Sequence, residues 1–283
     1  MFRRELLRIV RPNPARNEGL DYLEGVEENG HISSGLAVEP VTGRTYPIKN
    51  GYLDLLGRKV GADNVANVTN FLPGAGPLYE PLWRVRSLSL LTGEDFPIQR
   101  ELGIIADLVR LDRGGLYLDL GCSAGLYTRS LAAELGSRGD IVGIDISPSM
   151  LKEAARRARK IGAAPSLARA DAENLPFADA SFDGAVCGGS LNEFGDPART
   201  LRERRRVLAP GGRVAIMGIL KAQSARARSL QRFLSTAGGV RFFEPEEVTS
   251  LLDHASLQPD PLKTHGVVFF AGATAVRRAG DSG

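Results

Sequence analysis

Cysteine and long apolar stretches are scarce in this chain of 283 residues. Only two cysteines are present, Cys122 and Cys187, which excludes a disulfide framework and a four-cysteine zinc site. No apolar run reaches the roughly 18 to 20 residues of a membrane span, and the amino terminus lacks a long apolar core followed by a small-residue cleavage site. We therefore expect a cytoplasmic protein without a membrane span, in which both thiols serve packing.

An excess of one charge is also absent. The chain carries 36 basic and 33 acidic residues, and 43% of its residues are hydrophobic, as is ordinary for a soluble globular protein. Arginine greatly outnumbers lysine and gathers on three predicted amphipathic helices, at Lys152–Lys160, Arg199–Arg206 and Lys221–Arg232. We expect these faces to be solvated. A nucleic-acid site would instead require the arginines on one face with aromatic residues among them.

The most informative stretch joins a buried strand, a glycine loop and a helix. Leu116–Leu120 is apolar enough for a strand covered on both faces, and Asp119 is its single charge. Such a carboxylate is costly to bury unless a ligand or backbone donors meet it. Gly121 and Gly125 permit a sharp bend and a close approach, and the helix Leu126–Leu135 points its first N–H groups at the same place. The pattern indicates a ligand site, the alternative being a tight turn without a ligand.

Residues 119–125 (DLGCSAG) resemble the first motif of class I S-adenosylmethionine (SAM) dependent methyltransferases, an acid followed by Gly-x-Gly-x-Gly. Ser123 stands where the family has its middle glycine. A dinucleotide-binding loop would need Gly-x-Gly-x-x-Gly to seat a pyrophosphate on the helix. This loop lacks the third glycine, and Asp119 would repel a phosphate. A ligand with an ammonium group, a sulfonium and no phosphate suits the loop better.

Further strings follow in the order that the family has them. Asp145 ends a second buried strand and is placed to accept hydrogen bonds from ribose hydroxyls; the residues after it (ISPSML) resemble the start of the family's next helix. Residues 170–177 (ADAENLPF) resemble the segment in which an aspartate, here Asp171, accepts from the adenine amino group. Residues 188–194 (GGSLNEF) follow the fourth strand, where the resemblance places the acceptor beside the methyl group.

The resemblance implies an α/β fold, a Rossmann-like doubly wound seven-stranded sheet with SAM across the carboxyl ends of its strands. The product would be S-adenosyl-L-homocysteine. The residues that we expect to bind the cofactor are Asp119, Gly121, Cys122, Ser123, Gly125, Asp145, Ile146, Met150, Asp171, Ala172 and Gly188.

The chain is expected to have three parts. Residues 1–60 read as a small β appendage whose end is similar to zinc-ribbon modules found ahead of some methyltransferase domains. Glu39 and Thr42 stand where those modules have a Cys-x-x-Cys pair, so we expect a ribbon without metal. Residues 61–97 read as a helical, aromatic lid, with Tyr79 and Trp83 as candidates for binding the acceptor. Residues 98–283 form the predicted SAM-binding domain.

Three functions are compatible with these residues. The first is methyl transfer to a small, apolar acceptor, supported by a resemblance to ubiquinone and menaquinone type methyltransferases. The second is methylation of an RNA base, against which we find no Asn-Pro-Pro-Tyr string after the fourth strand. The third is SAM binding without catalysis. The acceptor, the methylated atom and the oligomeric state stay open.

A general base is needed only if the acceptor keeps its proton at neutral pH. Glu193 and Asn192 sit at the expected mouth of the acceptor site, where Asn192 is also a candidate for binding the acceptor. His265 and Tyr127 are further candidates for the base, although a histidine with a structural role is more common than a catalytic one.

Overall fold

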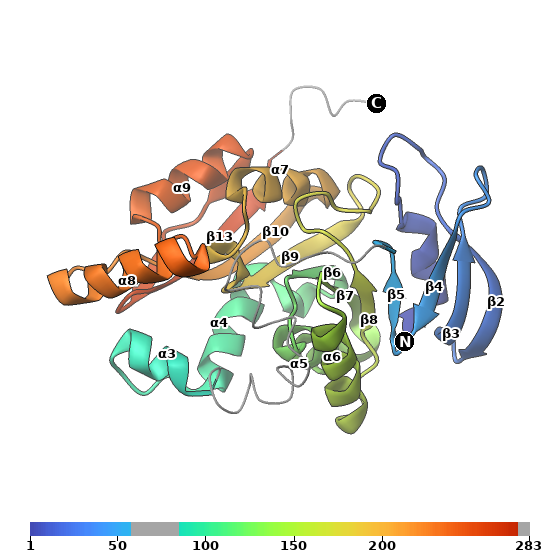
Figure 1. Ribbon diagram of the computed structural model, residues 1–283, viewed down its shortest axis with the longest axis horizontal. Helices are drawn as coiled ribbons and strands as arrows, with labels where there is room; N and C mark the ends of the chain where they lie inside the picture. Colours follow the sequence, from blue (N-terminus) through green and yellow to red (C-terminus); the bar gives the residue numbers. More distant parts are fainter. Residues whose placement is uncertain (58–84, 277–283) are drawn as a thin grey trace.

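The computed structural model describes residues 1–57 and 85–276 (Figure 1). Tyr79 and Trp83 lie outside the described residues, so their proposed contact with the acceptor stays a prediction. The described part of the expected lid is helix α3 (Val85–Thr92). Its Leu88 is buried with Phe96 and Phe270, which packs the helix against the sheet.

Seven strands form the core in the order β8-β7-β6-β9-β10-β13-β11. The first five are mutually parallel, and β13 runs antiparallel to both of its neighbours. The strands are β6 (Gly115–Leu120), β7 (Gly139–Asp145), β8 (Ser166–Arg169), β9 (Phe182–Gly188), β10 (Leu208–Ile219), β11 (Leu257–Pro259) and β13 (Val268–Ala275). The predicted doubly wound α/β class is confirmed. The strand order reverses between β6 and β9, which places a crevice at their carboxyl ends.

Helices cover both faces of this sheet (Figure 1). On one face lie α4 (Ile98–Val109), α5 (Leu126–Leu135) and α6 (Pro148–Lys160), and on the other lie α7 (Pro197–Val207) and α9 (Pro245–His254). Strand alternation explains the two layers: Leu118 and Leu120 pack in the cluster that contains α7 and α9, whereas Tyr117 packs with α4 and α5. Helix α8 (Ala225–Gly238) projects from one end of the molecule.

The amino-terminal strands continue the same sheet. They are β1 (Phe2–Arg3), β2 (Asp21–Glu28), β3 (His31–Val38), β4 (Thr45–Lys49) and β5 (Tyr52–Asp54), with the 3-10 helix η1 (Arg4–Ile9) after β1. Because β5 pairs in parallel with β8, the sheet has 13 strands. Phe2, Ile32 and Ile48 share one hydrophobic cluster with the core strands. The segment that the sequence predicted as an appendage is therefore packed as an extension of the core.

A buried ion pair holds this junction. Arg169 of β8 lies 3.3 Å from the Asp54 carboxylate of β5, and both side chains are about nine-tenths buried. The Arg169 Nε also donates to the carbonyl of Ile146 at 3.0 Å. The amino-terminal strands are thus connected to the loop that follows β7.

The positions of the missing cysteine pair lie in the turn between β3 and β4. The Thr42 hydroxyl donates to the Glu39 carboxylate at 2.5 Å, so the two residues bond directly to each other. Within residues 1–57 and 85–276 no group of three or more His, Cys, Asp or Glu side chains could hold a metal ion. The ribbon without metal and the division into three parts stay predictions.

Near the carboxyl end, β12 (Lys263–His265) pairs with β13 in an antiparallel hairpin. The expectation that all basic helices are solvated on their charged side was wrong for α7. Arg204 is fully buried and Arg205 is 5% exposed, because consecutive arginines on a helix reach around to its inner face. None of the described helices is long and apolar enough to cross a bilayer.

Candidate functional site

Three acids lie at the carboxyl ends of three adjacent strands. Asp119 is the penultimate residue of β6, Asp145 ends β7, and Asp171 lies just after β8. Neighbouring strands lie about 4.8 Å apart, so these side chains emerge at one edge of the sheet. The charge of Asp145 contributes to raising the pKa of both Asp119 and Glu193. The structure thus brings together the residues that the sequence predicted to meet.

Asp119 is the most buried of the three acids, with 2% of its surface exposed. The Thr128 hydroxyl of α5 donates to its Oδ2 at 2.5 Å. Burial is the main reason that the pKa of Asp119 is raised to about 6, and the Thr128 hydrogen bond opposes the rise. A positively charged ligand group beside Asp119 would offset this desolvation and favour the ionised carboxylate.

Asp145 joins two loops. Its Oδ2 accepts from the Ser123 N–H at 2.9 Å, and its Oδ1 accepts from the Ser147 N–H at 2.8 Å. Burial raises the pKa of Asp145, while these backbone donors lower it. Each carboxylate oxygen can accept a second hydrogen bond. Asp145 therefore holds the glycine loop in place and keeps acceptor capacity for a hydroxyl pair.

The loop after β6 depends on left-handed backbone at three positions. Gly121, Ser123 and Gly125 have φ of +65°, +49° and +75°. For Ser123 this conformation costs about 1–2 kcal/mol, which gives a physical reason for the family's preference for glycine there. The backbone bond from Ser123 to Asp145 helps to hold the strained residue.

The two glycines also make room for the protein's own side chains. A Cβ on Gly121 would lie 2.5 Å from the Ser190 Oγ, and one on Gly125 would lie 2.8 Å from the Ala154 Cβ. The Ser190 hydroxyl donates to the Gly121 carbonyl at 2.9 Å. The glycine spacing thus reflects packing as well as any close approach of a ligand.

The other predicted cofactor residues line the same edge. Cys122, Met150 and Ala172 are buried, whereas Ile146 and Gly188 are partly exposed. Burial raises the pKa of the Cys122 thiol well above its ordinary value and also raises that of Cys187. Both sulfurs therefore stay neutral thiols, consistent with packing.

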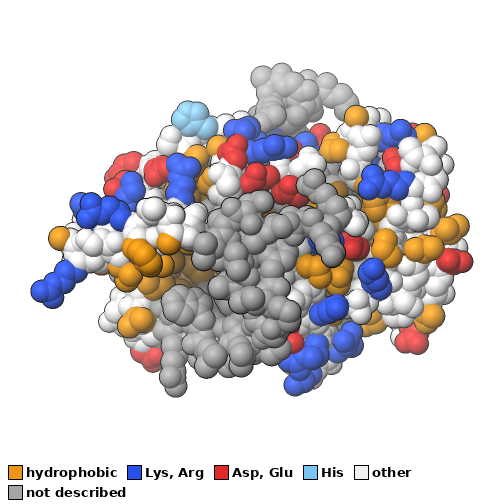
Figure 2. Space-filling view, viewed as in Figure 1, with side chains coloured by type: hydrophobic (Ala, Val, Ile, Leu, Met, Phe, Trp, Pro, Cys, Tyr) orange, Lys and Arg blue, Asp and Glu red, His pale blue; other side chains and the backbone are white. Residues whose placement is uncertain are grey.

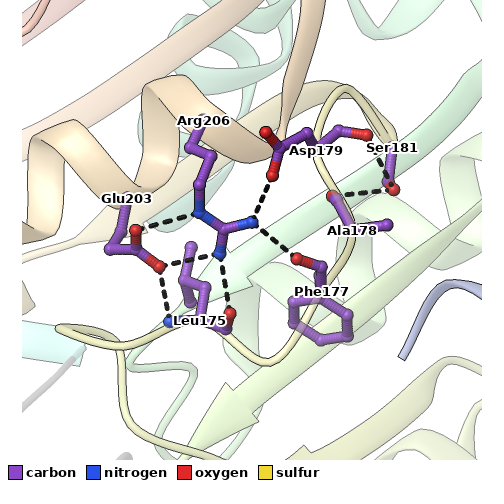
Figure 3. Close-up of polar contacts among 7 residues, drawn as sticks. All are labelled: Leu175, Phe177, Ala178, Asp179, Ser181, Glu203 and Arg206. Carbon is purple, nitrogen blue, oxygen red and sulfur yellow. Dashed lines mark hydrogen bonds and ion pairs between the residues drawn. The ribbon is translucent and has the colours of Figure 1, made fainter. Parts of the chain in front are cut away.

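The segment after β8 is held by α7 (Figure 3). Asp171 Oδ1 accepts from the Glu173 N–H at 2.9 Å, which fixes the turn. Further along, the Arg206 guanidinium donates to the carbonyls of Leu175 and Phe177, at 2.8 and 2.7 Å. Arg206 also pairs with Asp179 at 2.7 Å. These bonds position the predicted adenine segment.

Glu203 completes this arrangement (Figure 3). Its carboxylate accepts from Arg206 at 2.8 and 2.9 Å and from the Leu175 N–H at 2.9 Å. The sequence reasoning missed Arg206 and Glu203, because the charge run containing them was interpreted as a solvated face. It also missed Thr128 and Ser190, for which the motifs give no signal.

Glu193 is the candidate acid–base group that the structure brings to the site. It follows the 3-10 helix η5 (Ser190–Asn192) after β9. Burial, and secondarily the charge of Asp145, raises the pKa of Glu193 to about 7. A carboxyl group with this pKa exchanges its proton near neutral pH, as a general base or acid requires.

Asn192 has a different role from the one predicted. Its Nδ2 donates to the carbonyls of Ile219 and Arg241, at 2.9 and 2.6 Å, and its Oδ1 accepts from the Ile219 N–H at 3.0 Å. The side chain is 2% exposed. Because its amide is committed to backbone groups, Asn192 fixes the end of β10, and contact with an acceptor is not supported.

Tyr127 and His265 are engaged elsewhere. Tyr127 is buried, donates to Glu101, and its ring fills the space beside Gly188. The His265 Nδ1 lies 2.9 Å from the Glu94 carboxylate. The His265 ring packs edge-on against Phe96, with 5.1 Å between the ring centroids. His265 is on β12, which β9, β10 and β13 separate from β6. The structure therefore does not bring His265 to the three acids.

Comparison with known proteins agrees with this geometry. A family model described as a methyltransferase domain matches residues 118–216. The chain is 36% identical over 121 residues to a 2-phytyl-1,4-naphtoquinone methyltransferase of Nostoc punctiforme, a match covering 42% of this chain and 53% of the relative. It thus spans about half the length of that relative.

A longer match is to the protein of the same description in Thermosynechococcus vestitus, with 30% identity over 169 residues, 60% of this chain and 72% of the relative. Among solved structures, the cyclase SpnF has a TM-score of 0.56 and 20% identity, with 72% of this chain and 95% of SpnF covered. At that identity the likeness shows the fold alone.

Proposed function

The chain belongs to the class I SAM-dependent methyltransferase family, and on that premise we propose that it transfers a methyl group from SAM to a small, largely apolar acceptor. The observation that carries the proposal is the convergence of Asp119, Asp145 and Asp171 at the switch in strand order. Three carboxylates suit a ligand with an ammonium group, a ribose and an exocyclic amine. They do not suit a phosphate.

The residues present fit this cofactor. Asp119 would hold the ammonium group, Asp145 the ribose hydroxyls and Asp171 the adenine amine. When bound, SAM supplies an electrophilic methyl group that is already activated. The chain's contribution is then to orient the two reactants and exclude water. Glu193 would accept a proton where the acceptor carries one at the reacting atom.

The proposed class of acceptor is supported by the names of the relatives. Their names describe methyltransferases that act on a phytyl-naphthoquinone or on demethylmenaquinone, which supports an acceptor with a quinone-like ring. A nucleic-acid acceptor is not favoured, because the arginine-rich helices α6 and α7 lie on opposite faces of the sheet (Figure 1). Their charges therefore do not form one basic surface.

Calorimetry with S-adenosylhomocysteine tests the cofactor site. We expect binding by the unmodified chain and at least about tenfold weaker binding by Asp171→Ala, since a buried hydrogen bond to a charged group is worth about 1.5–3 kcal/mol. Asp253→Ala, which changes an exposed acid on α9, is the matched control. Binding that is equal in both variants would contradict the role of Asp171.

Transfer from radiolabelled SAM tests the reaction. The acceptors are a reduced naphthoquinone with an isoprenoid side chain and, separately, total RNA. Label in the organic phase supports the proposal, and label in RNA would contradict the acceptor class. Binding of the cofactor with transfer to neither would favour a protein that binds SAM without catalysis.

A further inference from the structure

Helix α8 is attached to the molecule by its polar side. Gln231 donates to the Leu220 carbonyl and accepts from the Ala222 N–H, at 2.9 and 2.8 Å. The Arg228 Nε donates to the Ala222 carbonyl at 2.7 Å. Both residues lie on one stripe of the helix, one turn apart. The helix is therefore fixed to the chain just beyond the carboxyl end of β10.

The opposite side of α8 is apolar and exposed. Leu230, Phe233 and Leu234 are spaced three and four residues apart, which places them on one face, and they are 61%, 66% and 41% exposed. None of the side chains described in α8 is buried. Most helical stability in proteins comes from packing an apolar face. This arrangement points to a partner for that face.

The charge of α8 indicates the chemistry of that partner. The helix contains Arg226, Arg228 and Arg232 and no acidic residue. Beneath it a cleft of about 770 Å³ is also lined by Lys221 and Arg241, which pair with Glu244 and Glu247. Figure 2 shows basic and hydrophobic side chains next to each other on the projecting helix.

We propose that α8 docks on an anionic lipid surface, with Leu230, Phe233 and Leu234 inserted among the acyl chains and Arg226, one turn before Leu230 on the same stripe, at the head groups. Arg228 and Arg232 lie on the polar side of the helix, which lines the cleft, and leucine and aromatic side chains on one face with arginine on the polar face are typical of interfacial binding. Anionic lipids attract such cations by about 1 kcal/mol each. A second copy of this chain fits less well, since a symmetric contact would bring the arginines of both helices together without an acid on either.

The position of α8 suits delivery of an acceptor from the lipid to the site. The helix starts shortly after β10, one strand from β9, whose end leads to Glu193. A lipid-dissolved acceptor could then reach the site without crossing water. This use rests on the proposed function, whereas the lipid binding itself does not.

Sedimentation with vesicles tests the proposal. The probes are vesicles of phosphatidylcholine with about a quarter phosphatidylglycerol, and vesicles of phosphatidylcholine alone. We expect the unmodified chain to prefer the anionic vesicles. The double variant Leu230→Ser/Phe233→Ser should lower the partition coefficient at least about tenfold, and Arg226→Gln about fivefold. The controls are Val41→Ser and Arg202→Gln, which change exposed residues on the β3–β4 turn and on α7.

The replaced side chains of α8 are exposed, so the variants should keep the thermal midpoint and the affinity for S-adenosylhomocysteine. No binding of the unmodified chain to anionic vesicles would overturn the proposal. So would a dimer in solution that Leu230→Ser/Phe233→Ser dissociates, since α8 would then be a subunit interface. Failure of the proposed function would instead appear as absent cofactor binding while vesicle binding persists.

Discussion

At the scale of single residues, Ser123 shows how one position in the motif carries strain. It has a left-handed backbone where the family has glycine, and its hydroxyl makes a long contact, 3.5 Å, with the Met150 sulfur. We expect Ser123→Gly to raise the free energy of unfolding by about 0.5–1 kcal/mol, measured by urea denaturation. Ser123→Ala keeps the strain and should not stabilise. Equal stabilisation by both would contradict this account.

Glu193 gives a prediction about pH. Its pKa is raised to about 7, whereas an unfolded glutamate titrates near pH 4.3. Between about pH 4.3 and pH 7 the folded state therefore holds a proton that the unfolded state releases. The free energy of unfolding falls as pH rises through this window. Glu193→Gln, which stays neutral, should exceed the unmodified chain in unfolding free energy by about 3–4 kcal/mol at pH 8 and match it near pH 4.

Thermal or urea unfolding at both pH values measures this difference. Asp253→Asn, at an exposed acid of α9, is the control and should show little change between them. A gain for Glu193→Gln that is the same at pH 4 and pH 8 would show that the effect has another origin than titration.

At the scale of elements, α7 sets the shape of the segment after β8. The planar guanidinium of Arg206 donates to two carbonyls and two carboxylates at once, a geometry that the point charge of lysine cannot match. We expect Arg206→Lys to weaken binding of S-adenosylhomocysteine about tenfold, measured by calorimetry. Arg202→Lys, on the exposed side of the same helix, should bind as the unmodified chain does. Unchanged affinity in Arg206→Lys would show that the segment holds its shape without this residue.

The sequence predicted those elements whose pattern is local. The helix Leu126–Leu135 has the predicted bounds, because apolar periodicity and glycines delimit it. Strand β2 was missed, since its side chains are almost all exposed and no alternation marks it. The burial of Arg204 and the engagement of Asn192 depend on contacts between distant segments, which a charge run or a motif does not encode.

At the scale of the whole molecule, the pairing of β5 with β8 makes one sheet of two sequence-defined parts. The sequence gives no local signal for this pairing, because its strands are more than a hundred residues apart and parallel strands lack a connecting turn. The sequence nevertheless predicted that three acids would lie at adjacent strand ends, as they do, whereas their roles in binding the cofactor stay predictions. Asp119, Asp145 and Asp171 follow strands that are each identifiable alone, and parallel order then brings their ends together.

One sheet and one core imply one unfolding transition. Asp54→Asn keeps the side-chain acceptor for the Leu56 and Gly57 N–H groups but removes the carboxylate charge that pairs with the buried Arg169 guanidinium. We expect the free energy of unfolding to fall by about 3 kcal/mol, seen as a lowered midpoint of a single transition in far- and near-ultraviolet circular dichroism. Glu27→Gln breaks the more exposed pair with Arg4 and should cost at most about 1 kcal/mol. Two separate transitions, with only the first shifted by Asp54→Asn, would contradict this prediction. They would show that the amino-terminal strands fold independently of the site and that the continuity of the sheet contributes nothing to the cooperativity of the core.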